Sequence, residues 1–162
     1  MKTVLSSASL VVVGATVSPS IFLFFALRSI LVFTAVKYTK RHEWVSVLNN
    51  TGIVGMSKYA VDKLGDIVFI QLPDVGTTVS QDGCGTIESV KAASDFYAPV
   101  SGVVKAVNEV IENKPSVLNK SPEDQGWLFE VELTNPVEVE GLMSETEYRK
   151  YLNAESKQDS SG

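Results

Sequence analysis

The chain has 162 residues, of which 44% are hydrophobic, and is long enough for one compact domain with a buried core. The formal net charge is −5, and all 19 acidic residues lie at or beyond Glu43, together with only nine of the 14 Lys and Arg residues. A body this acidic excludes a nucleic-acid-binding role, which needs Lys and Arg to neutralise phosphates, and suits solubility and basic protein partners.

Residues 1–36 are predicted to lie outside the fold. This segment has no acidic residue, is rich in Ser and Thr, and is almost continuously apolar over 10–36. The composition favours an organelle-targeting leader, although such leaders are usually richer in Arg. A membrane anchor is an alternative, but Ser18-Pro19-Ser20 and Arg28 interrupt the apolar run that a span requires. A misassigned gene start is the third alternative, and in each case the folded domain should begin near Lys37.

Short β-like segments then alternate with Gly, Asn, Asp and Pro, the pattern of a small β barrel or sandwich. Residues 44–47 and 53–56 are predicted to form a hairpin, because the Asn and Gly residues between them tolerate left-handed backbone angles. A helix of about two turns is expected next, with Ser57 as its N-cap and Gly65 at its end.

Four further strands are predicted from apolar runs separated by turn residues, at 67–72, 83–90, 96–100 and 103–107. The first of these is rich in β-branched residues, so we expect it to be buried. Lys91 falls between the second and the third.

The C-terminal part begins with residues 127–133, which alternate apolar and acidic side chains and indicate a half-exposed strand. Ser144 and Glu147 then match the S-x-x-E capping box, and apolar residues follow at helical spacing. The folded part is therefore divided into a β domain over 37–141, a helix packed on it over 142–156, and a polar tail over 157–162.

The single cysteine and the single histidine limit the chemistry of the chain. Cys84 has no partner for an internal disulfide, a redox pair or a thiolate metal cage. Because His42 is the only histidine of the chain, a metal site made of several histidines is excluded, and a catalytic triad could use only this imidazole. We expect His42 to be a structural residue at a strand end, Cys84 to be an inert strand residue, and the chain to have neither a catalytic site nor a metal.

Lys91 differs from a generic surface lysine in its neighbours. A β run ends just before it, and the small residues Ala92, Ala93 and Ser94 follow it. A hairpin tip of this kind would present the ε-amine at a fixed angle to a modifying enzyme. The pattern therefore predicts a carrier that holds a cofactor arm on Lys91, with an ordinary exposed lysine as the alternative.

A long set of motifs surrounds this lysine and extends through residues 37–154. They include Glu88-Ser89-Val90-Lys91-Ala92-Ala93-Ser94-Asp95, Tyr97-Ala98-Pro99-Val100-Ser101-Gly102, His42-Glu43-Trp44-Val45, Gly52-Ile53-Val54-Gly55-Met56-Ser57, Leu72-Pro73-Asp74-Val75-Gly76, Asn119-Lys120-Ser121 and Gly126-Trp127-Leu128. Together these motifs resemble the glycine cleavage system H protein family around its lipoylation site.

The resemblance implies a mainly β fold of the biotinyl/lipoyl hammerhead type, a barrel-sandwich hybrid with a short helix and a C-terminal helix. It implies lipoic acid attached by an amide to Lys91, because the reactive sulfur pair must come from a cofactor. In the family, the arm accepts an aminomethyl group from glycine decarboxylase (P protein) and passes it to the aminomethyltransferase (T protein). Dihydrolipoamide dehydrogenase (L protein) then reoxidises the arm. The chain would be a monomeric, non-catalytic carrier of the mitochondrial matrix, without stable membrane insertion.

Three other residues carry roles implied by the same resemblance. Glu43 and Tyr59 match positions near the docked arm, and Glu88 matches a position that lipoylating enzymes could read. The alternatives are a solvated strand carboxylate for Glu43, a core aromatic for Tyr59 and a cross-hairpin pair for Glu88.

Four other functions are alternatives to the lipoyl carrier of the glycine cleavage system. A biotin carrier would have Met on both sides of its lysine, whereas Val90 and Ala92 stand there. An acyltransferase-linked lipoyl domain would have Asp before the lysine and a linker to a catalytic region. An H-like relay that donates lipoyl groups to other enzymes shares the same residues. A non-lipoylated interaction module would keep the fold and leave Lys91 unmodified.

Overall fold

The computed structural model of the chain describes residues 35–159. The predicted leader over 1–36 lies outside the described residues except for its last two, and so do residues 160–162 of the predicted tail. Among residues 35–159, no helix is both long enough and apolar enough to cross a membrane.

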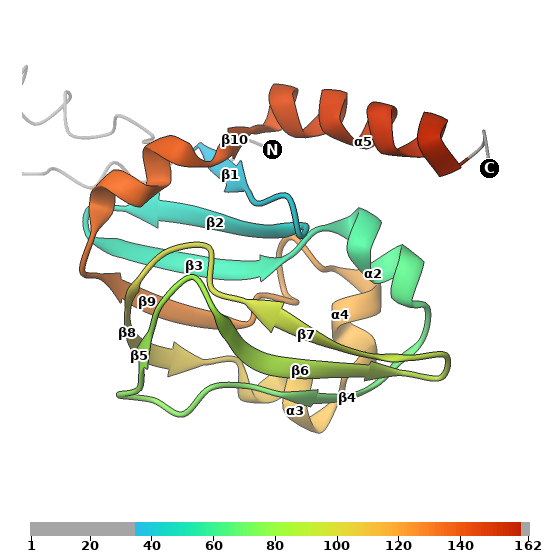
Figure 1. The fold of residues 1–162 in the computed structure, drawn as a ribbon. Helices are drawn as coiled ribbons and strands as arrows, with labels where there is room; N and C mark the ends of the chain where they lie inside the picture. The colour runs from blue at the N-terminus through green and yellow to red at the C-terminus, as the bar shows by residue number, and fades with distance from the viewer. Residues whose placement is uncertain (1–34, 160–162) are drawn as a thin grey trace, which may run out of the picture. The chain divides into compact units, whose positions relative to one another are not determined.

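Two antiparallel sheets make up most of this structure (Figure 1). The seven-stranded sheet has the order β10-β1-β2-β3-β9-β8-β5, and the three-stranded sheet has the order β4-β6-β7. Neither closes into a barrel, so the predicted mainly β fold is confirmed as a pair of open sheets. The strands are β1 (Val36–Tyr38), β2 (Glu43–Leu48), β3 (Thr51–Met56), β4 (Ile67–Gln71), β5 (Thr78–Val79), β6 (Gly83–Ser89), β7 (Ala93–Tyr97), β8 (Gly102–Val107), β9 (Phe129–Leu133) and β10 (Met143–Ser144).

The helices are α2 (Lys58–Leu64), α3 (Glu109–Asn113), α4 (Ser116–Lys120), a 3-10 helix (Pro136–Gly141) and α5 (Glu145–Asp159). The sequence did not predict α3, α4 or the 3-10 helix, because segments of five or six residues are too short to show a helical period. Helix α5 also differs from the expected 142–156: it starts later, since Met143 and Ser144 pair with β1, and it continues to Asp159.

Helix α2 matches its prediction, and the first hairpin is present with strands longer than the predicted 44–47 and 53–56. Leu48 pairs with Thr51 across a two-residue turn in which Asn49 has a φ of 57°. At the start of α2, the Ala60 N–H donates to the Ser57 hydroxyl at 3.3 Å, which satisfies one of the free donors of the first turn. Gly65 ends the helix with a φ of 86°.

Strand β4 is less buried than its apolar sequence indicates. Ile67 and Ile70 face the core, but Val68 and Phe69 are exposed by 55% and 47%. A register shift between Ile67 and Phe69 produces a β-bulge, so that two successive side chains point outward. The prediction of a buried strand is therefore wrong at these two positions.

Strand β7 begins three residues before the predicted strand over 96–100. Ser94 pairs with Ile87, and Asp95 pairs with Thr86, so the hairpin extends almost to Lys91. Small and polar residues have weak β propensity, but pairing with β6 imposes the strand conformation on them. The turn around Lys91 is consequently shorter than expected.

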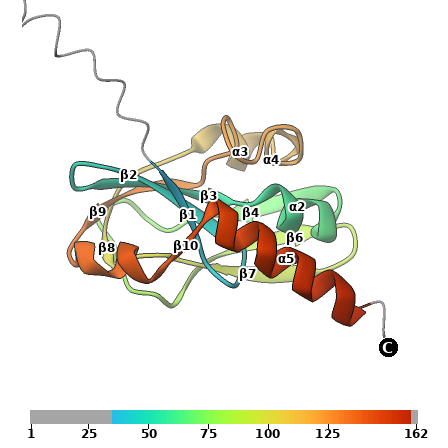
Figure 2. The same cartoon turned by 90° about the horizontal axis from the view of Figure 1, so that it is seen from above.

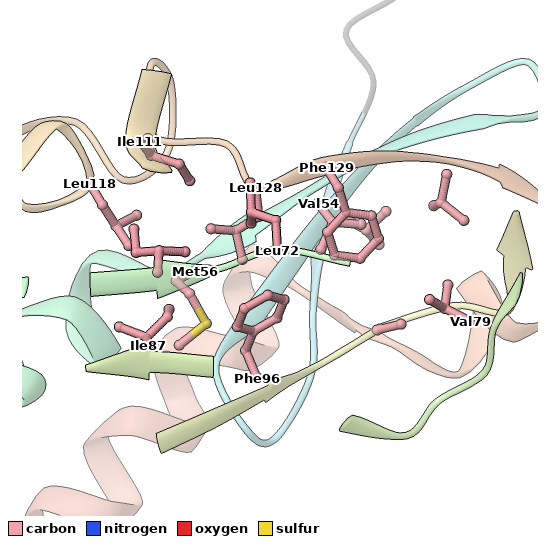
Figure 3. Close-up of a cluster of buried hydrophobic side chains, with 14 of the residues drawn as sticks. Val54, Met56, Leu72, Val79, Ile87, Phe96, Ile111, Leu118, Leu128 and Phe129 are labelled. Carbon is pink, nitrogen blue, oxygen red and sulfur yellow. The ribbon is translucent and has the colours of Figure 1, made fainter. Parts of the chain in front are cut away.

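The main core joins the two sheets and the three short helices α2, α3 and α4 (Figure 3). Phe96 of β7 and Phe129 of β9 lie with ring centroids 6.4 Å apart and connect the small sheet to the large one. Ile111 of α3 and Leu118 of α4 are fully buried in the same core. Each such side chain contributes roughly 1.5–3 kcal/mol through burial, so the core firmly anchors the base of the β6–β7 hairpin.

Helix α5 lies beside β1 and β10 at the edge of the large sheet (Figure 2). A separate aromatic cluster holds it there. Tyr148 stacks on Tyr38 with ring centroids 4.3 Å apart, and Trp44 is buried beside them. The helix begins with the predicted capping box: the Ser144 N–H donates to the Glu147 carboxylate at 2.8 Å, and the Glu147 N–H donates to the Ser144 hydroxyl at 3.4 Å.

Candidate functional site

Lys91 is exposed at the tip of the β6–β7 hairpin, at the end of the domain that also carries α2 and the C-terminal end of α5 (Figures 1 and 2). Among residues 35–159, no ion pair engages its ammonium group. Its side chain passes over Gly65, where an added Cβ would lie 3.4 Å from both Cε and Nζ of Lys91. Gly65 thus permits the left-handed backbone and leaves room beneath the lysine.

One hydroxyl organises residues 89–92, which we call the Lys91 turn. Ser89 Oγ accepts hydrogen bonds from the backbone N–H groups of Lys91 (3.2 Å) and Ala92 (3.1 Å). The same hydroxyl donates to the Ala92 carbonyl at 3.1 Å, to which the Ser89 N–H also donates at 2.8 Å. Side-chain bonds of this kind stabilise tight turns, so the backbone that carries the amine is fixed.

The Lys91 turn also rests on a corner that α4 supports. The Val90 N–H donates to the Asp66 carbonyl at 3.0 Å. On either side of Asp66, Asn119 donates through Nδ2 to the Gly65 carbonyl (2.7 Å) and accepts at Oδ1 from the Ile67 N–H (3.0 Å). The amide of Asn119 thereby links the lysine-bearing tip to α4, a contact that sequence reasoning did not predict.

Exposed apolar side chains lie beside the Lys91 turn. Val90 is exposed by 65% and stands next to the lysine, with Val68 and Phe69 exposed on β4. Glu88 is exposed and pairs in register with Phe69 of β4 and Ala93 of β7, neither of which is charged. Glu88 therefore does pair across the hairpin, and its recognition by lipoylating enzymes stays a prediction.

A pocket of about 340 Å³ opens between α2, the β6–β7 hairpin and α5. Tyr59 is half-buried in its wall, so the alternative of a core aromatic is wrong for this residue. We call this cavity the Tyr59 pocket. Its lining combines apolar and charged side chains: Met56, Tyr59, Ala60, Leu64, Arg41, His42, Lys63, Ser94, Asp95 and Glu155. Leu64 and Ser94 bring it next to Gly65 and the Lys91 turn.

His42 connects this pocket to α5. Its φ is 77°, its ring centroid lies 4.8 Å from that of Tyr59, and its Nδ1 lies 2.9 Å from the Tyr148 hydroxyl, which is 2.7 Å from the Ser57 hydroxyl. Burial lowers the pKa of His42, while the nearby Glu155 carboxylate opposes this shift. These contacts support the structural role expected for His42, which also lines the pocket.

Glu43 occupies a different place from Tyr59. Its side chain is only 1% exposed, so the alternative of a solvated carboxylate is wrong. Oε1 accepts a hydrogen bond from the Tyr97 N–H at 3.0 Å, and Oε2 accepts one from the Thr39 hydroxyl. Glu43 lines a neighbouring pocket of about 300 Å³, and the Arg41 guanidinium stacks 3.7 Å from the centre of the Tyr97 ring at its border.

The described residues offer little chemistry of their own. Cys84 is half-buried in β6, and burial raises its pKa to about 12, which keeps the thiol protonated and unreactive, as expected. Among residues 35–159, no three His, Cys, Asp or Glu side chains are grouped so that they could hold a metal ion. What the site can do is present an amine and accommodate something attached to it.

Sequence reasoning missed several residues that shape this site. Ser89 stood within one of the motifs around Lys91, and its hydrogen bonds reach only two and three residues along the chain, but its role in the turn was not predicted. Glu155 gave no signal, since it lies in a charged segment far from Lys91 in the sequence. Of the predicted residues, Lys91 and Tyr59 lie at one end of the domain, Glu88 lies on the exposed face beside them, and Glu43 is enclosed.

Comparisons with known proteins agree on one family. The family described as Glycine cleavage H-protein matches residues 36–155. The chain is 50% identical over 120 residues to the mitochondrial glycine cleavage system H protein of Drosophila melanogaster, covering 73% of each protein. It is 47% identical over 117 residues to the glycine cleavage system H protein of Listeria monocytogenes, covering 72% of this chain and 94% of the relative.

A solved structure shares the same architecture. The crystal structure of a glycine cleavage system H protein from Mycobacterium marinum superposes with a TM-score of 0.68 at 34% sequence identity. The match covers 77% of this chain and 99% of that chain, so the likeness includes the whole of the solved protein apart from 1%.

Proposed function

This chain belongs to the glycine cleavage H-protein family, and we propose that it is the lipoyl carrier of the glycine cleavage system, with lipoic acid joined by an amide to the Lys91 ε-amine. The observation that carries the proposal is an exposed lysine at the tip of a hairpin whose backbone is fixed from two sides, with no ion pair to it from the part of the chain that the structure describes. An amine in this setting is open to acylation and costs the fold nothing when its charge is lost.

The residues around Lys91 fit a long attached arm. When bound, the lipoyl group supplies the dithiol chemistry that a chain with one cysteine lacks. Ser89 and Asn119 would hold the attachment point, and Gly65 leaves the path beside Leu64 clear. The apolar floor of the Tyr59 pocket, made by Met56, Ala60 and Leu64, would cover the arm and keep water away from it.

The remaining site residues have separate proposed roles. Tyr59 would contact the docked arm directly. Glu43 would act indirectly, because its carboxylate accepts a hydrogen bond from the Tyr97 backbone and does not line the Tyr59 pocket. Glu88 and the apolar side chains of Val90 and Phe69 would be read by the lipoylating enzyme, since they are exposed and lie next to Lys91.

The partners would be glycine decarboxylase, the aminomethyltransferase, dihydrolipoamide dehydrogenase and lipoylating enzymes, each acting on the same tethered arm. Tethering raises the effective concentration of the arm at each partner without any catalytic group on the carrier. The proposed location is the mitochondrial matrix, which is supported by the Drosophila relative, named as mitochondrial.

A reconstituted glycine cleavage system tests the proposal. The chain lipoylated at Lys91 should support glycine-dependent release of CO₂ with the three partner enzymes, and the unmodified chain should not. Lys91→Arg should abolish this activity while changing the free energy of unfolding by no more than about 0.5 kcal/mol. Lys114→Arg, at another exposed lysine, is the matched control. Retained activity of Lys91→Arg would refute the proposal, and lipoyl donation to other enzymes without glycine turnover would favour the relay.

A further inference from the structure

A chain of hydrogen bonds joins α2 to α5 through His42. The Tyr148 hydroxyl of α5 lies 2.9 Å from His42 Nδ1 and 2.7 Å from the Ser57 hydroxyl. The same Ser57 oxygen accepts a hydrogen bond from the Ala60 N–H at 3.3 Å, and Ser57 is only 1% exposed. One hydroxyl of α5 therefore connects the imidazole to the residue that caps α2.

The number of available hydrogens fixes the direction of this chain when His42 is neutral. If Nδ1 accepts the single hydrogen of the Tyr148 hydroxyl, the Ser57 hydroxyl must donate to the Tyr148 oxygen. The imidazole hydrogen then lies on Nε2, which faces Glu155 Oε2 at 3.6 Å. With a neutral ring, both hydroxyl hydrogens of the chain therefore have acceptors.

A protonated His42 reverses the chain. Nδ1 becomes a donor to the Tyr148 oxygen, so the Tyr148 hydroxyl must turn toward Ser57 Oγ. Within residues 35–159, the hydrogen-bond partners of the Ser57 hydroxyl are the Tyr148 hydroxyl and the Ala60 N–H, so its own hydrogen then has no acceptor. A buried donor without an acceptor is costly, and protonation therefore weakens the connection between α2 and α5.

Several elements place titratable or charged groups around the His42 ring. They are Tyr148, Tyr151 and Glu155 on α5, Tyr59 and Lys63 on α2, Glu43 on β2, and Arg41 and Asp95, which line the same pocket. Burial is the largest influence and lowers the pKa of His42, Glu155 and Glu43 raise it, and Lys63 lowers it. The net shift is downward, so the folded chain favours the neutral ring, in agreement with the hydrogen-bond directions.

We propose that the hydrogen-bonded side chains of His42, Tyr148 and Ser57 form a pH-sensitive switch, which holds α5 to α2 while His42 is neutral and releases α5 when Nδ1 takes up a proton. We call these three side chains the His42 switch. Because α2 and α5 both form walls of the Tyr59 pocket, release of α5 would open that pocket. The switch needs nothing attached to Lys91, so its failure would leave the proposed carrier function standing.

Hydrogen exchange of the full chain without any attached group tests the His42 switch. Protection factors of the amides from Tyr148 to Glu155, which are corrected for intrinsic exchange rates, should fall as the pH decreases from 6.5 to the folded-state pKa of His42. The fall should reach about tenfold per pH unit and stop below that pKa. Amides of the buried strand β9, such as that of Val131, should exchange more slowly at every pH. Protection of α5 that is independent of pH, or exchange of α5 only at the rate of β9, would overturn the switch.

Two variants distinguish the switch from a purely structural contact. His42→Asn tolerates the φ of 77° but has no titratable ring, so the pH dependence of α5 protection should vanish. Tyr148→Phe removes the donor to Nδ1 and should raise the pKa of His42 above the wild-type value in an NMR titration, because the neutral ring loses a hydrogen bond. Tyr38→Phe, which alters the ring stacked on Tyr148, is the matched control and should leave this pKa unchanged. An unchanged pH dependence in His42→Asn, or an unchanged pKa in Tyr148→Phe, would contradict the proposal.

Discussion

The Lys91 turn and the Tyr59 pocket lie at the same end of the domain but are built in different ways. The turn is organised by Ser89, two residues before the lysine, and is braced by a single distant side chain, Asn119. The pocket collects side chains from Arg41 to Glu155 and depends on α5 being in place. The turn can therefore be recognised from sequence and should keep its geometry when α5 is disturbed, whereas the pocket should not.

Removing Tyr148, which anchors α5, should have the most different effects on the two regions. Tyr148→Ala deletes the ring that stacks on Tyr38 and the hydroxyl that contacts His42 and Ser57. We expect the free energy of unfolding to fall by about 3–5 kcal/mol, as for other buried aromatic truncations, in urea titrations. Lipoylation of Lys91 in the folded fraction should proceed at the wild-type rate. Tyr148→Phe, which loses only the hydroxyl, is the control, and a lipoylation defect in it would show that the regions are coupled.

Removing the Asn119 side chain, which links the Lys91 turn to α4, should instead affect the lipoylation of Lys91 as well as the stability. Asn119→Ala leaves the Gly65 carbonyl and the Ile67 N–H without their partner, which should cost about 1–3 kcal/mol of unfolding free energy. Because Asp66 then holds Val90 less firmly, lipoylation should slow as well. Asn113→Ala removes an exposed side-chain bond within α3 and should affect neither property. A normal lipoylation rate for Asn119→Ala would mean that the brace does not govern the turn.

Removing the Ser89 hydroxyl from the Lys91 turn should change the stability less than the rate of lipoylation. Ser89→Ala removes the hydroxyl that accepts from Lys91 and Ala92, and we expect a loss of roughly 0.5–1.5 kcal/mol. The lipoylating enzyme should modify Ser89→Ala more slowly in a mass-spectrometric time course. Ser80→Ala provides a comparison, since the exposed Ser80 hydroxyl donates to the nearby Asp82 carboxylate at 2.8 Å, away from Lys91. If both variants are modified equally fast, the hydroxyl is dispensable for presenting the lysine.

Acidification should lower the stability through His42, beside α5, and this effect should be the smallest of those predicted here. Burial lowers the pKa of His42 in the folded chain below its ordinary value of 6.5, with Glu155 and Glu43 opposing the shift and Lys63 reinforcing it. The unfolded chain therefore binds the proton more readily. The contribution of His42 to stability is complete above pH 6.5 and is lost as the pH falls through the folded-state pKa. NMR titration of the imidazole signal should give a value below 6.5, and a higher value would contradict this assignment.

The parts of the fold that could be predicted were those encoded locally. The Asn-rich turn after Leu48, the Ser57 cap, the Gly65 terminator and the capping box at Ser144 each act within a few residues. The motifs around Lys91 located the candidate attachment site for the same reason.

The errors arose where distant partners decide the structure. The bulge at Val68 turns two apolar residues outward, and pairing with β6 extends β7 through Ser94 and Asp95. Helices α3 and α4 are stabilised by burial of Ile111 and Leu118 rather than by a visible period. The position of Glu155 in the Tyr59 pocket depends on the packing of α5, which no spacing in the sequence reveals.

The central claim is that Lys91 carries the functional group, and the intact mass of the protein isolated from its source tests it most directly. We predict a mass increase equal to one amide-linked lipoyl group, mapped by peptide fragmentation to Lys91 and absent from Lys91→Arg expressed in the same source. Native protein that never carries this group, or that carries it on another lysine, would contradict the account.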